Sequence, residues 1–404
     1  MAEVLHIREK NMKNIKTLLA ILTISLIFSV FTTAASAKPS NASWTFMVYL
    51  DADNNLDPYG FLNIQQMSSG LTVGANLNVI VLMDRLNQPA YLYRITYNNV
   101  ETILFLGEVD MGSPQTLAWF VKYTLKNYAA QHYILDLWDH GGGYRGICWD
   151  DSSGNHLSPH DVETALAESE KKYRTKIDIV GFDACLMGMI EVCYELKDVA
   201  NIVIGSEMLI PGYGWPYESL MQYLSTNSNV DPYTLSKEIV NEYVSYYANM
   251  QSTYFVQLSA IDETSVPKMA ESLNSFANYL SQNIDTYKGI IADARGVAQQ
   301  GFIMGTMGAY YYIDLYKFAY IIQEKAENET LDSLASNLME NIAAIVFAEE
   351  HTKPQGNLDA KQFGLTINFP PNLQTYSSKY ETYVQCFTTE TTWLNLLMTY
   401  YKAT

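Results

Sequence analysis

From Trp44 onward, the chain alternates apolar runs of strand length with amphipathic segments of helix length. This alternation is typical of βαβ units, in which helices cover both faces of a parallel sheet. Strands buried on both faces are apolar and β-branched almost throughout, and the runs in the first half of the chain have this character. We therefore predict an α/β fold with strands at Thr45–Leu50, Leu77–Met83, His132–Trp138, Lys176–Phe182 and Ile202–Ser206.

The segments between these runs carry signals for one hairpin and several helices. Tyr97-Asn98-Asn99 separates two strand-like segments, Tyr91–Tyr97 and Thr102–Leu106, which predicts a hairpin at the edge of the sheet. Ser158 can cap a helix that has Pro159 at its first position and Asp161 completing an approximate capping box. The expected helices are Pro114–Tyr128, Pro159–Tyr173 and Gly188–Val199.

The character of the chain changes beyond Asp231, where long helical patterns dominate. We expect helices at Pro232–Ala248, Val266–Gln282, Asp314–Glu327 and Leu331–Glu350, with strands near Tyr254–Ala260 and at Phe363–Phe369. Residues 38–262 are accordingly assigned to an α/β core. Residues 263–404 form a mainly helical C-terminal portion that returns a strand near 363–369.

The first 37 residues have the pattern of an export signal. Lys13 and Lys16 precede an apolar run from Leu18 to Phe31, and Ala35-Ser36-Ala37 supplies a small-residue cleavage site. A membrane-spanning helix needs about 20 apolar residues, so this run is short for an anchor. We expect residues 1–37 to be a signal peptide and the protein to be secreted without a stable membrane anchor; an uncleaved anchor is the alternative.

Charge and composition exclude two classes of protein. The chain has 25 Lys and Arg against 43 Asp and Glu, a net charge of −18, which would repel a nucleic-acid backbone. Because 48% of the residues are hydrophobic and only 17% charged, disorder is excluded as the dominant state. Four cysteines in an exported chain would ordinarily suggest disulfides, but their irregular spacing shows no framework.

A histidine and a cysteine follow two of the predicted strands at corresponding points. His140 opens the sequence His-Gly-Gly-Gly after one strand, and Cys185 follows Asp183-Ala184 after the next. One helical crossover joins these strands, so they are expected to be neighbours with their carboxyl ends at one rim, where open parallel sheets bind ligands. The start of the predicted helix at Gly188 would lower the pKa of the Cys185 thiol.

Each of these residues alone also has an ordinary structural interpretation. An isolated cysteine is commonly an inert core residue, and a histidine at a sheet rim commonly bonds to a loop. The presence of both residues at equivalent strand ends favours their assignment as a nucleophile and its base. The glycines after His140 support this assignment, because they let backbone N–H groups approach a ligand.

Four long segments resemble the clostripain family of cysteine peptidases, which have a caspase-like fold. They are WTFMVYLDADNNLD, LDLWDHGGGYRGICWDD, VGFDACLMGMIEVCYEL and GSEMLIPGYGWPY, in order from Trp44 to about Tyr217, and FGLTINFP near Phe363 is similar to a late strand of the family. The resemblance implies that residues 38–262 are a caspase-like catalytic core. It also implies that His140 is the catalytic histidine and Cys185 the nucleophile.

The implied mechanism is acyl transfer through a thioester. Cys185 attacks the scissile carbonyl, the backbone N–H groups of Cys185 and Gly141 stabilise the oxyanion, and His140 protonates the leaving amine. The resemblance assigns Asp183 to the primary specificity pocket, where it would bind an Arg or Lys side chain. The expected substrates are proteins or peptides.

Three departures from the family pattern bear on these expectations. Tyr213 stands in the PGxGW turn where relatives often have a second acidic residue, so the preference for basic side chains is weakened or broadened. Between Asp150 and Glu170 there is no Lys or Arg at which a self-cleavage typical of the family could occur. The third concerns calcium, on which family members can depend.

No cofactor is expected for the chemistry itself, and calcium remains an open candidate. Asp51, Asp53, Asn55 and Asp57 are spaced as in the first half of an EF-hand loop. However, Leu56 replaces the required glycine and Leu62 stands where the bidentate Glu belongs. We favour a structural role for these side chains at the strand end and the start of the following helix.

Two alternatives to a peptidase remain at this point. A catalytically silent, exported binding protein would retain the fold for recognition alone, although it would have no chemical reason to keep both His140 and Cys185. A transpeptidase would use the same acyl-enzyme and differ only in the nucleophile that resolves it.

Overall fold

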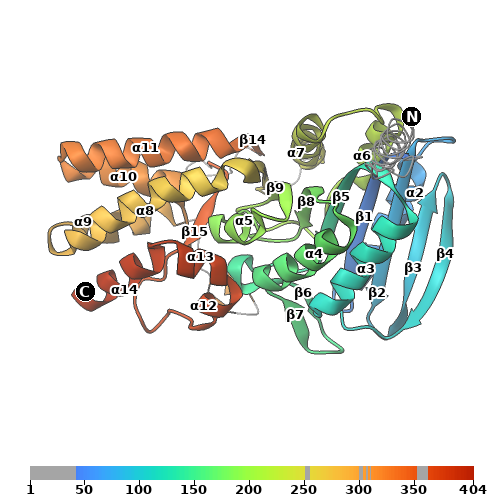
Figure 1. Cartoon of the computed structure of the whole chain (residues 1–404), viewed down its shortest axis with the longest axis horizontal. Coiled ribbons are helices and arrows are strands. Elements are labelled where there is room, and N and C mark those ends of the chain that lie inside the picture. Colours follow the sequence, from blue (N-terminus) through green and yellow to red (C-terminus); the bar gives the residue numbers. More distant parts are fainter. Residues whose placement is uncertain (1–41, 251–254, 300–303, 306–307, 310, 353–362) are drawn as a thin grey trace, which may run out of the picture. The chain divides into compact units, whose positions relative to one another are not determined.

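A mixed sheet of nine strands, in the order β14-β10-β9-β8-β5-β1-β2-β3-β4, organises the protein (Figure 1). The computed structural model describes residues 42–250, 255–299, 304–305, 308–309, 311–352 and 363–404, so the expected signal peptide lies outside the described residues. The parallel centre of the sheet consists of β1 (Ala42–Ala52), β2 (Leu77–Arg85), β5 (Ala130–Trp138), β8 (Ile177–Asp183) and β9 (Ala200–Gly205). These are the five strands predicted from apolar runs.

Antiparallel strands complete both edges of the sheet. The predicted hairpin consists of β3 (Gln88–Thr96) and β4 (Asn99–Gly107), and β3 pairs with β2. At the opposite edge, β10 (Gln257–Asp262) pairs with β9, and β14 (Val346–His351) pairs with β10.

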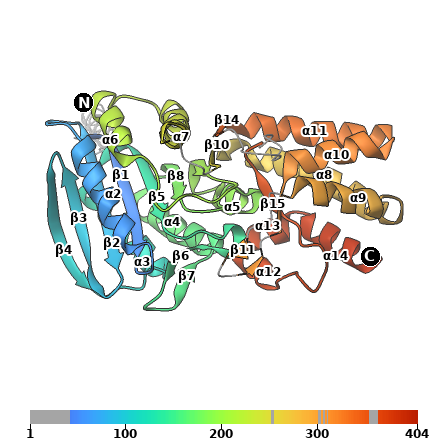
Figure 2. The same cartoon turned by 180° about the vertical axis from the view of Figure 1, so that it is seen from behind.

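Helices cover both faces of the sheet. Alternate side chains of β1 point to opposite faces, so Phe46 and Val48 belong to one hydrophobic core and Met47 and Tyr49 to the other. The first core also contains residues of α2 (Asp57–Gly70), α6 (Tyr217–Thr226) and α7 (Pro232–Asn249). The second contains residues of α3 (Pro114–Asn127), α4 (Pro159–Tyr173) and α5 (Ile190–Leu196). Figure 1 shows α3 and α4 on the near side of the sheet, and Figure 2 shows α2 in front when the molecule is turned.

The start of α4 shows why local signals were sufficient for this helix. The Ser158 side chain accepts a hydrogen bond from the Asp161 N–H at 3.1 Å, and the Asp161 carboxylate accepts one from the Ser158 N–H at 2.9 Å. Pro159 occupies the first turn. The predicted capping box and both ends of the helix are therefore confirmed.

The C-terminal portion contributes to the same core as α3–α5. Residues of α8 (Val266–Gln282), α9 (Ile284–Ala298), α10 (Leu315–Ala326), α11 (Glu329–Ile345) and α14 (Trp393–Ala403) all belong to it. Short helices α12 (Lys379–Tyr383) and α13 (Gln385–Glu390) precede α14. Single-turn 3₁₀ helices lie at Gly143–Arg145 and Glu263–Ser265.

Two expectations for this portion differ from the structure. The helix expected to run to Glu350 ends at Ile345, and the chain continues as the edge strand β14. Residues 363–369 do contain a strand, β15 (Thr366–Asn368), but it pairs with β13 (Tyr312–Asp314) in a separate two-stranded sheet. The C-terminal strand that joins the large sheet is therefore β14. Two further small sheets pair β6 (Ile147–Asp150) with β7 (Asn155–Leu157), and β11 (Met304–Gly305) with β12 (Gly308–Ala309).

Within the described residues, none of the helices has both the length and the apolar character needed to cross a membrane.

Candidate active site

The carboxyl ends of β5, β8 and β9 surround a cavity of about 340 Å³. Side chains that follow these strands line it: Asp139 and His140 after β5, Asp183 and Cys185 at the end of β8, and residues of the loop after β9. Trp138 of β5 and Asp183 of β8 are paired in register, so His140 and Cys185 each lie two residues further along adjacent parallel strands. The arrangement inferred from the topology is therefore present.

The Cys185 sulfur is enclosed by backbone groups. Sγ accepts a hydrogen bond from the Ile210 N–H at 3.3 Å, and the Ile210 carbonyl oxygen lies 3.7 Å away. The Gly141 N–H also bonds to the sulfur. Burial nevertheless dominates and, with the nearby Asp183 and Asp139 carboxylates, raises the pKa of the Cys185 thiol to about 11.

The expectation that a helix start lowers this pKa is wrong. The helix expected from Gly188 begins at Ile190 and has only seven residues, so four residues lie between Cys185 and the start of the helix. Leu186 has a left-handed backbone conformation with φ of 67°, and its N–H bonds to the carbonyl of Met208. The chain thus turns away from β8 before the helix starts, so the Cys185 thiol does not lie at a helix start.

Asn55 contacts His140, which sequence reasoning missed. His140 Nε2 lies 2.8 Å from Asn55 Oδ1. An amide oxygen only accepts hydrogen bonds, so Nε2 carries the proton and Nδ1 keeps a free lone pair. Burial lowers the pKa of the imidazole, which favours this neutral form. The adjacent Asn54 donates to Asp139 Oδ1 at 2.6 Å, holding the loop after β1 against the residue before His140.

Gly141 packs directly against the backbone of Cys185. A Cβ atom on residue 141 would overlap the Cys185 carbonyl oxygen and lie 2.9 Å from the Cys185 nitrogen. Only glycine permits this approach without a shift of the backbone. The N–H groups of Gly141 and Cys185, expected to form an oxyanion hole, therefore belong to two chain segments in close contact.

Asp183 lines the cavity, and one of its carboxylate oxygens has no hydrogen-bond partner. Its Oδ2 accepts hydrogen bonds from the Trp215 N–H and the Tyr217 hydroxyl, both at 2.8 Å, whereas Oδ1 has no partner. The residue is only 4% exposed. Burial and the charge of Asp136 raise the pKa of this carboxyl well above its usual value.

A second buried carboxyl lies behind Asp183, and sequence reasoning missed this one too. The Tyr217 hydroxyl is 2.6 Å from Asp136 Oδ2 as well as 2.8 Å from Asp183 Oδ2. A hydroxyl donates only one proton, so both contacts are satisfied when one of the two carboxyls is protonated. Burial raises the pKa of Asp136 to about 7, consistent with a proton held by this pair near neutral pH.

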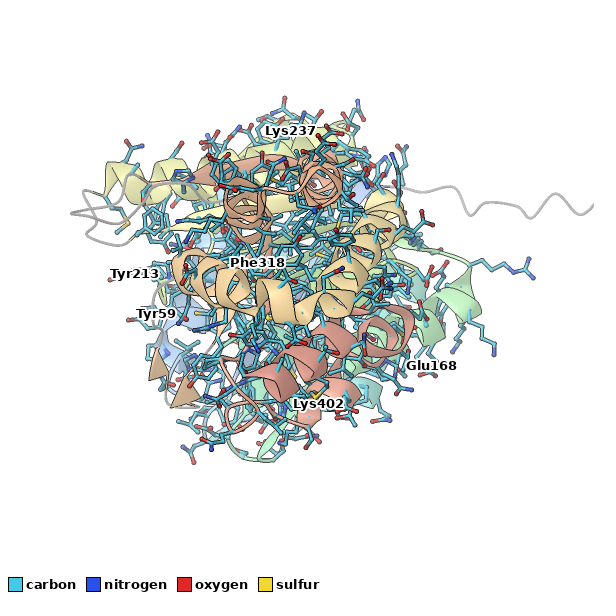
Figure 3. All side chains as sticks on the ribbon, turned by 90° about the vertical axis from the view of Figure 1, so that its left-hand side faces the viewer. Tyr59, Glu168, Tyr213, Lys237, Phe318 and Lys402 are labelled. Atoms are coloured by element: carbon cyan, nitrogen blue, oxygen red, sulfur yellow. The ribbon has the colours of Figure 1, made fainter. Side chains whose placement is uncertain are left out.

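Tyr213, expected in the substrate pocket, is not among the residues that line the cavity, although its neighbours Gly212 and Gly214 are. Its ring is 40% exposed and packs edge-on against Tyr59 at 5.4 Å, and its carbonyl accepts a hydrogen bond from Asn63. Figure 3 shows Tyr59 and Tyr213 next to each other at the left of the molecule.

The EF-hand-like residues at the end of β1 and just after it have separate partners. Asp57 forms a bidentate ion pair with Arg85, with distances of 2.6 and 2.9 Å, and Asn55 contacts His140. Asp51 accepts a hydrogen bond from the Asp53 N–H at 3.1 Å. Asp57, Asn55 and Asp51 thus each have a protein partner. The Asp53 carboxylate accepts a hydrogen bond from the Ser152 N–H at 3.2 Å.

All four cysteines are free in the structure. Cys148 and Cys193 are buried, whereas Cys185 and Cys386 are partly accessible.

Comparisons with known proteins agree with this architecture. The family model described as the Clostripain family matches residues 48–400. The sequence is 28% identical over 426 aligned positions to clostripain of Hathewaya histolytica, with 86% of this chain and 78% of that protein covered.

Two solved structures share the fold. One is a secreted C11 cysteine protease from Bacteroides thetaiotaomicron in complex with an irreversible peptide inhibitor, with a TM-score of 0.64 and 19% identity; the match covers 86% of this chain and 98% of that one. The other is an inactive zymogen C11 protease from Parabacteroides distasonis, with a TM-score of 0.65 and 19% identity over 89% of this chain and 99% of that one.

Proposed function

Because the chain belongs to the clostripain family of cysteine peptidases, we propose that it is an exported endopeptidase that uses Cys185 and His140 to cleave after Arg or Lys. One observation carries the proposal. A single cavity is lined by a thiol, an imidazole and a buried carboxylate oxygen that has no hydrogen-bond partner.

The proposed reaction starts from a neutral pair. The Cys185 thiol transfers its proton to His140 Nδ1 as the sulfur attacks the scissile carbonyl. Because the proton passes directly to the base during the attack, no free thiolate has to form from a thiol of raised pKa. The N–H groups of Cys185 and Gly141 stabilise the oxyanion. His140 then gives the proton to the leaving amine, and water hydrolyses the thioester. Ile210 must move away from the sulfur before the carbonyl can approach.

The proposed specificity rests on Asp183. Its free Oδ1 would accept hydrogen bonds from the guanidinium of Arg or the ammonium of Lys. A substrate cation next to Asp183 would favour the negative charge on that carboxylate, and the shared proton would then be held by Asp136 with the Tyr217 hydroxyl donating to Asp183. Because Tyr213 adds no second acid to this cavity, we expect Arg and Lys to be preferred less strictly than by a pocket with two carboxylates.

We also propose that residues 1–37 direct export and are then removed. The support is the basic and apolar pattern of this segment and the small residues at Ala35-Ser36-Ala37. The protein recovered from a culture medium would then start at Lys38; recovery of an intact N-terminus would contradict the proposal.

A panel of fluorogenic peptides tests the function. Substrates that differ only at the residue before the scissile bond would carry Arg, Lys, citrulline or Leu. We expect turnover of the Arg and Lys peptides with kcat/KM at least about tenfold above that of citrulline, an uncharged analogue of Arg, because only the cations pair with Asp183. Absence of turnover, together with no labelling of Cys185 by an Arg acyloxymethyl ketone, would contradict the proposal.

Asn55 is expected to position the catalytic histidine. Replacing Asn55 with Ala should lower kcat by about 10- to 100-fold with little change in KM, because the imidazole loses the acceptor that fixes its tautomer. A further variant separates positioning from general damage. Asn55→Asp places a carboxylate at His140 Nε2, so the acidic limb of the kcat/KM profile should move to higher pH. An unchanged profile in Asn55→Asp would contradict this role.

A further inference from the structure

A histidine, a cysteine and two glutamates meet where helices α4, α5 and α13 come together. His160 and Glu163 belong to α4, Glu195 to α5 and Cys386 to α13. One nitrogen of His160, one carboxylate oxygen of Glu195 and Sγ of Cys386 lie within 4.8 Å of one another. None of the four residues lines the active-site cavity. Helices far apart in the sequence thus bring nitrogen, sulfur and oxygen atoms to one point outside the candidate active site.

The spacing of these atoms suits ligands of a zinc ion. Bonds of about 2.1 Å to nitrogen or oxygen and about 2.3 Å to sulfur place tetrahedral ligand atoms about 3.4–3.7 Å apart. His160 Nδ1 lies 3.2 Å from Glu195 Oε2 and 3.9 Å from Glu163 Oε2, on either side of that range. The Cys386 sulfur lies within 4.8 Å of the first two atoms, so small side-chain rotations would complete the set.

Glu195 gives this cluster a buried acidic group that no Lys or Arg neutralises. The residue is 1% exposed, and burial raises the pKa of its carboxyl. Among the described residues, neither Glu195 nor Glu163 forms an ion pair with Lys or Arg. The Lys197 ammonium lies 3.5 Å from Glu390 instead. Because a buried carboxylate is costly without a compensating cation, a divalent ion would supply what the protein does not.

We propose that His160, Glu195 and Cys386 bind one zinc ion, with Glu163 or a water molecule as the fourth ligand. Imidazole and thiolate ligands favour Zn²⁺, whereas Ca²⁺ and Mg²⁺ take oxygen ligands. The ion would bind the lone pair of His160 Nδ1 and the Cys386 thiolate, and the thiol proton would pass to the solvent.

Two features of the surroundings support a built site. The Phe387 N–H donates a hydrogen bond to Glu195 Oε1 at 2.9 Å, which fixes the carboxylate with Oε2 towards His160. The side chains of His160 and Glu163 are 32% and 24% exposed, so an ion can enter from the solvent.

The ion would fasten α13, in the C-terminal portion, to two helices of the α/β core. The Cys386 and Glu195 side chains already interact, but through a single hydrogen bond from the thiol. A shared metal would replace that bond by coordination from all three helices. Binding does not rest on the proposed function, because the site and the active-site cavity have no residue in common.

Binding is measured in the Cys185→Ala protein, so that metal bound at the active-site thiol does not contribute. ZnCl₂ titrated into protein stripped with EDTA should occupy one site with a Kd of about 1 µM or below. At about 100 times the Kd, Zn²⁺ should raise the Tm by about 3–4 °C. Co²⁺ in place of Zn²⁺ should give the intense near-ultraviolet absorption of a cobalt–thiolate bond, which reports the cysteine directly.

Two ligand variants and one matched control locate the site. Adding Cys386→Ser should abolish the cobalt–thiolate absorption and weaken Zn²⁺ binding at least about 100-fold, since even outer-shell changes cost about 10- to 100-fold. His160→Gln should weaken binding to a similar extent. His132→Gln is the control, because His132 Nδ1 also lies beside a carboxylate, 3.3 Å from Asp178, but outside the cluster. Its Kd should stay within about threefold of the parent.

The outcomes separate a metal site from a hydrogen-bonded group. Loss of binding in both ligand variants but not in His132→Gln would support the zinc site. No uptake by the parent, a Co²⁺ complex without thiolate absorption, or unaltered binding in Cys386→Ser and His160→Gln would overturn it. Equal affinity for Ca²⁺ and Zn²⁺ would overturn the assignment to zinc. Peptide hydrolysis by the protein that retains Cys185 is a separate measurement, and its absence would count against the proposed function alone.

Discussion

Replacement of Cys185 with Ala should reduce kcat/KM for peptide hydrolysis by at least about 10⁴-fold, to the background rate. Without the sulfur no thioester can form, and the remaining N–H groups and His140 contribute only to binding and polarisation. The substitution removes one partly accessible sulfur and its contacts with Ile210, so the fold should persist. Steady-state kinetics on the Arg peptide and the Tm of the same preparation measure both effects.

Cys193→Ser provides the control for this experiment. Cys193 is buried in α5 near the Glu263 carboxylate, and serine is close to cysteine in size and can donate to the same carboxylate. The activity of the Cys193→Ser protein per folded molecule should stay within about threefold of that of the parent, because packing changes away from the site act mainly on stability. Loss of activity in a folded Cys193→Ser protein, or activity that survives in Cys185→Ala, would show that the nucleophile has been assigned to the wrong cysteine.

Replacement of Asp183 with Asn should lower kcat/KM for Arg and Lys peptides by about 100- to 1000-fold. Removing one partner of a buried ion pair typically costs about 3–5 kcal/mol, part of which the polar amide and the relaxed site recover. Asparagine has nearly the same shape, and its oxygen can still accept from the Trp215 N–H and the Tyr217 hydroxyl. The measurement is the ratio of kcat/KM for Arg to that for citrulline, which should fall towards one.

Asp136→Asn tests the accompanying proton assignment. An asparagine resembles the protonated carboxyl that we assign to Asp136, so the preference for Arg should change by less than about tenfold. Equal losses in Asp136→Asn and Asp183→Asn would mean that the charge is shared and that Asp183 is not the principal contact. Equal losses on Arg and citrulline peptides in Asp183→Asn would assign that residue a structural role.

Most of the sheet could be predicted because its central strands are buried on both faces. A strand such as β1 must then be apolar along its whole length, and this leaves a pattern that needs no knowledge of its neighbours. The same logic located Asp183, Cys185 and His140, since parallel strands present their carboxyl ends at one rim. Local capping signals were equally informative for α4.

The features that were missed depend on contacts between distant segments. Asn55 reaches His140 across 85 positions, and Asp136 meets Tyr217 across 81, so no spacing along the chain predicts either contact. The end of α11 was misplaced because Val346–His351 contains no Gly or Pro that would end a helix, but pairing with β10 makes it a strand. The short α5 has a related cause: residues 186–189 are used to turn the chain, which a hydrophobic pattern does not reveal.

The position of Ile210 against the Cys185 sulfur has a consequence for the chemical durability of the enzyme. Peroxide and small electrophiles react with thiolates, and a sheltered thiol with a pKa of about 11 presents almost none at neutral pH. A peptidase released into an oxidising medium would thereby keep its nucleophile reduced until a peptide displaces the loop. Covalent inhibitors of such an enzyme must gain their potency from substrate-like recognition, because a more reactive warhead alone finds no thiolate to attack.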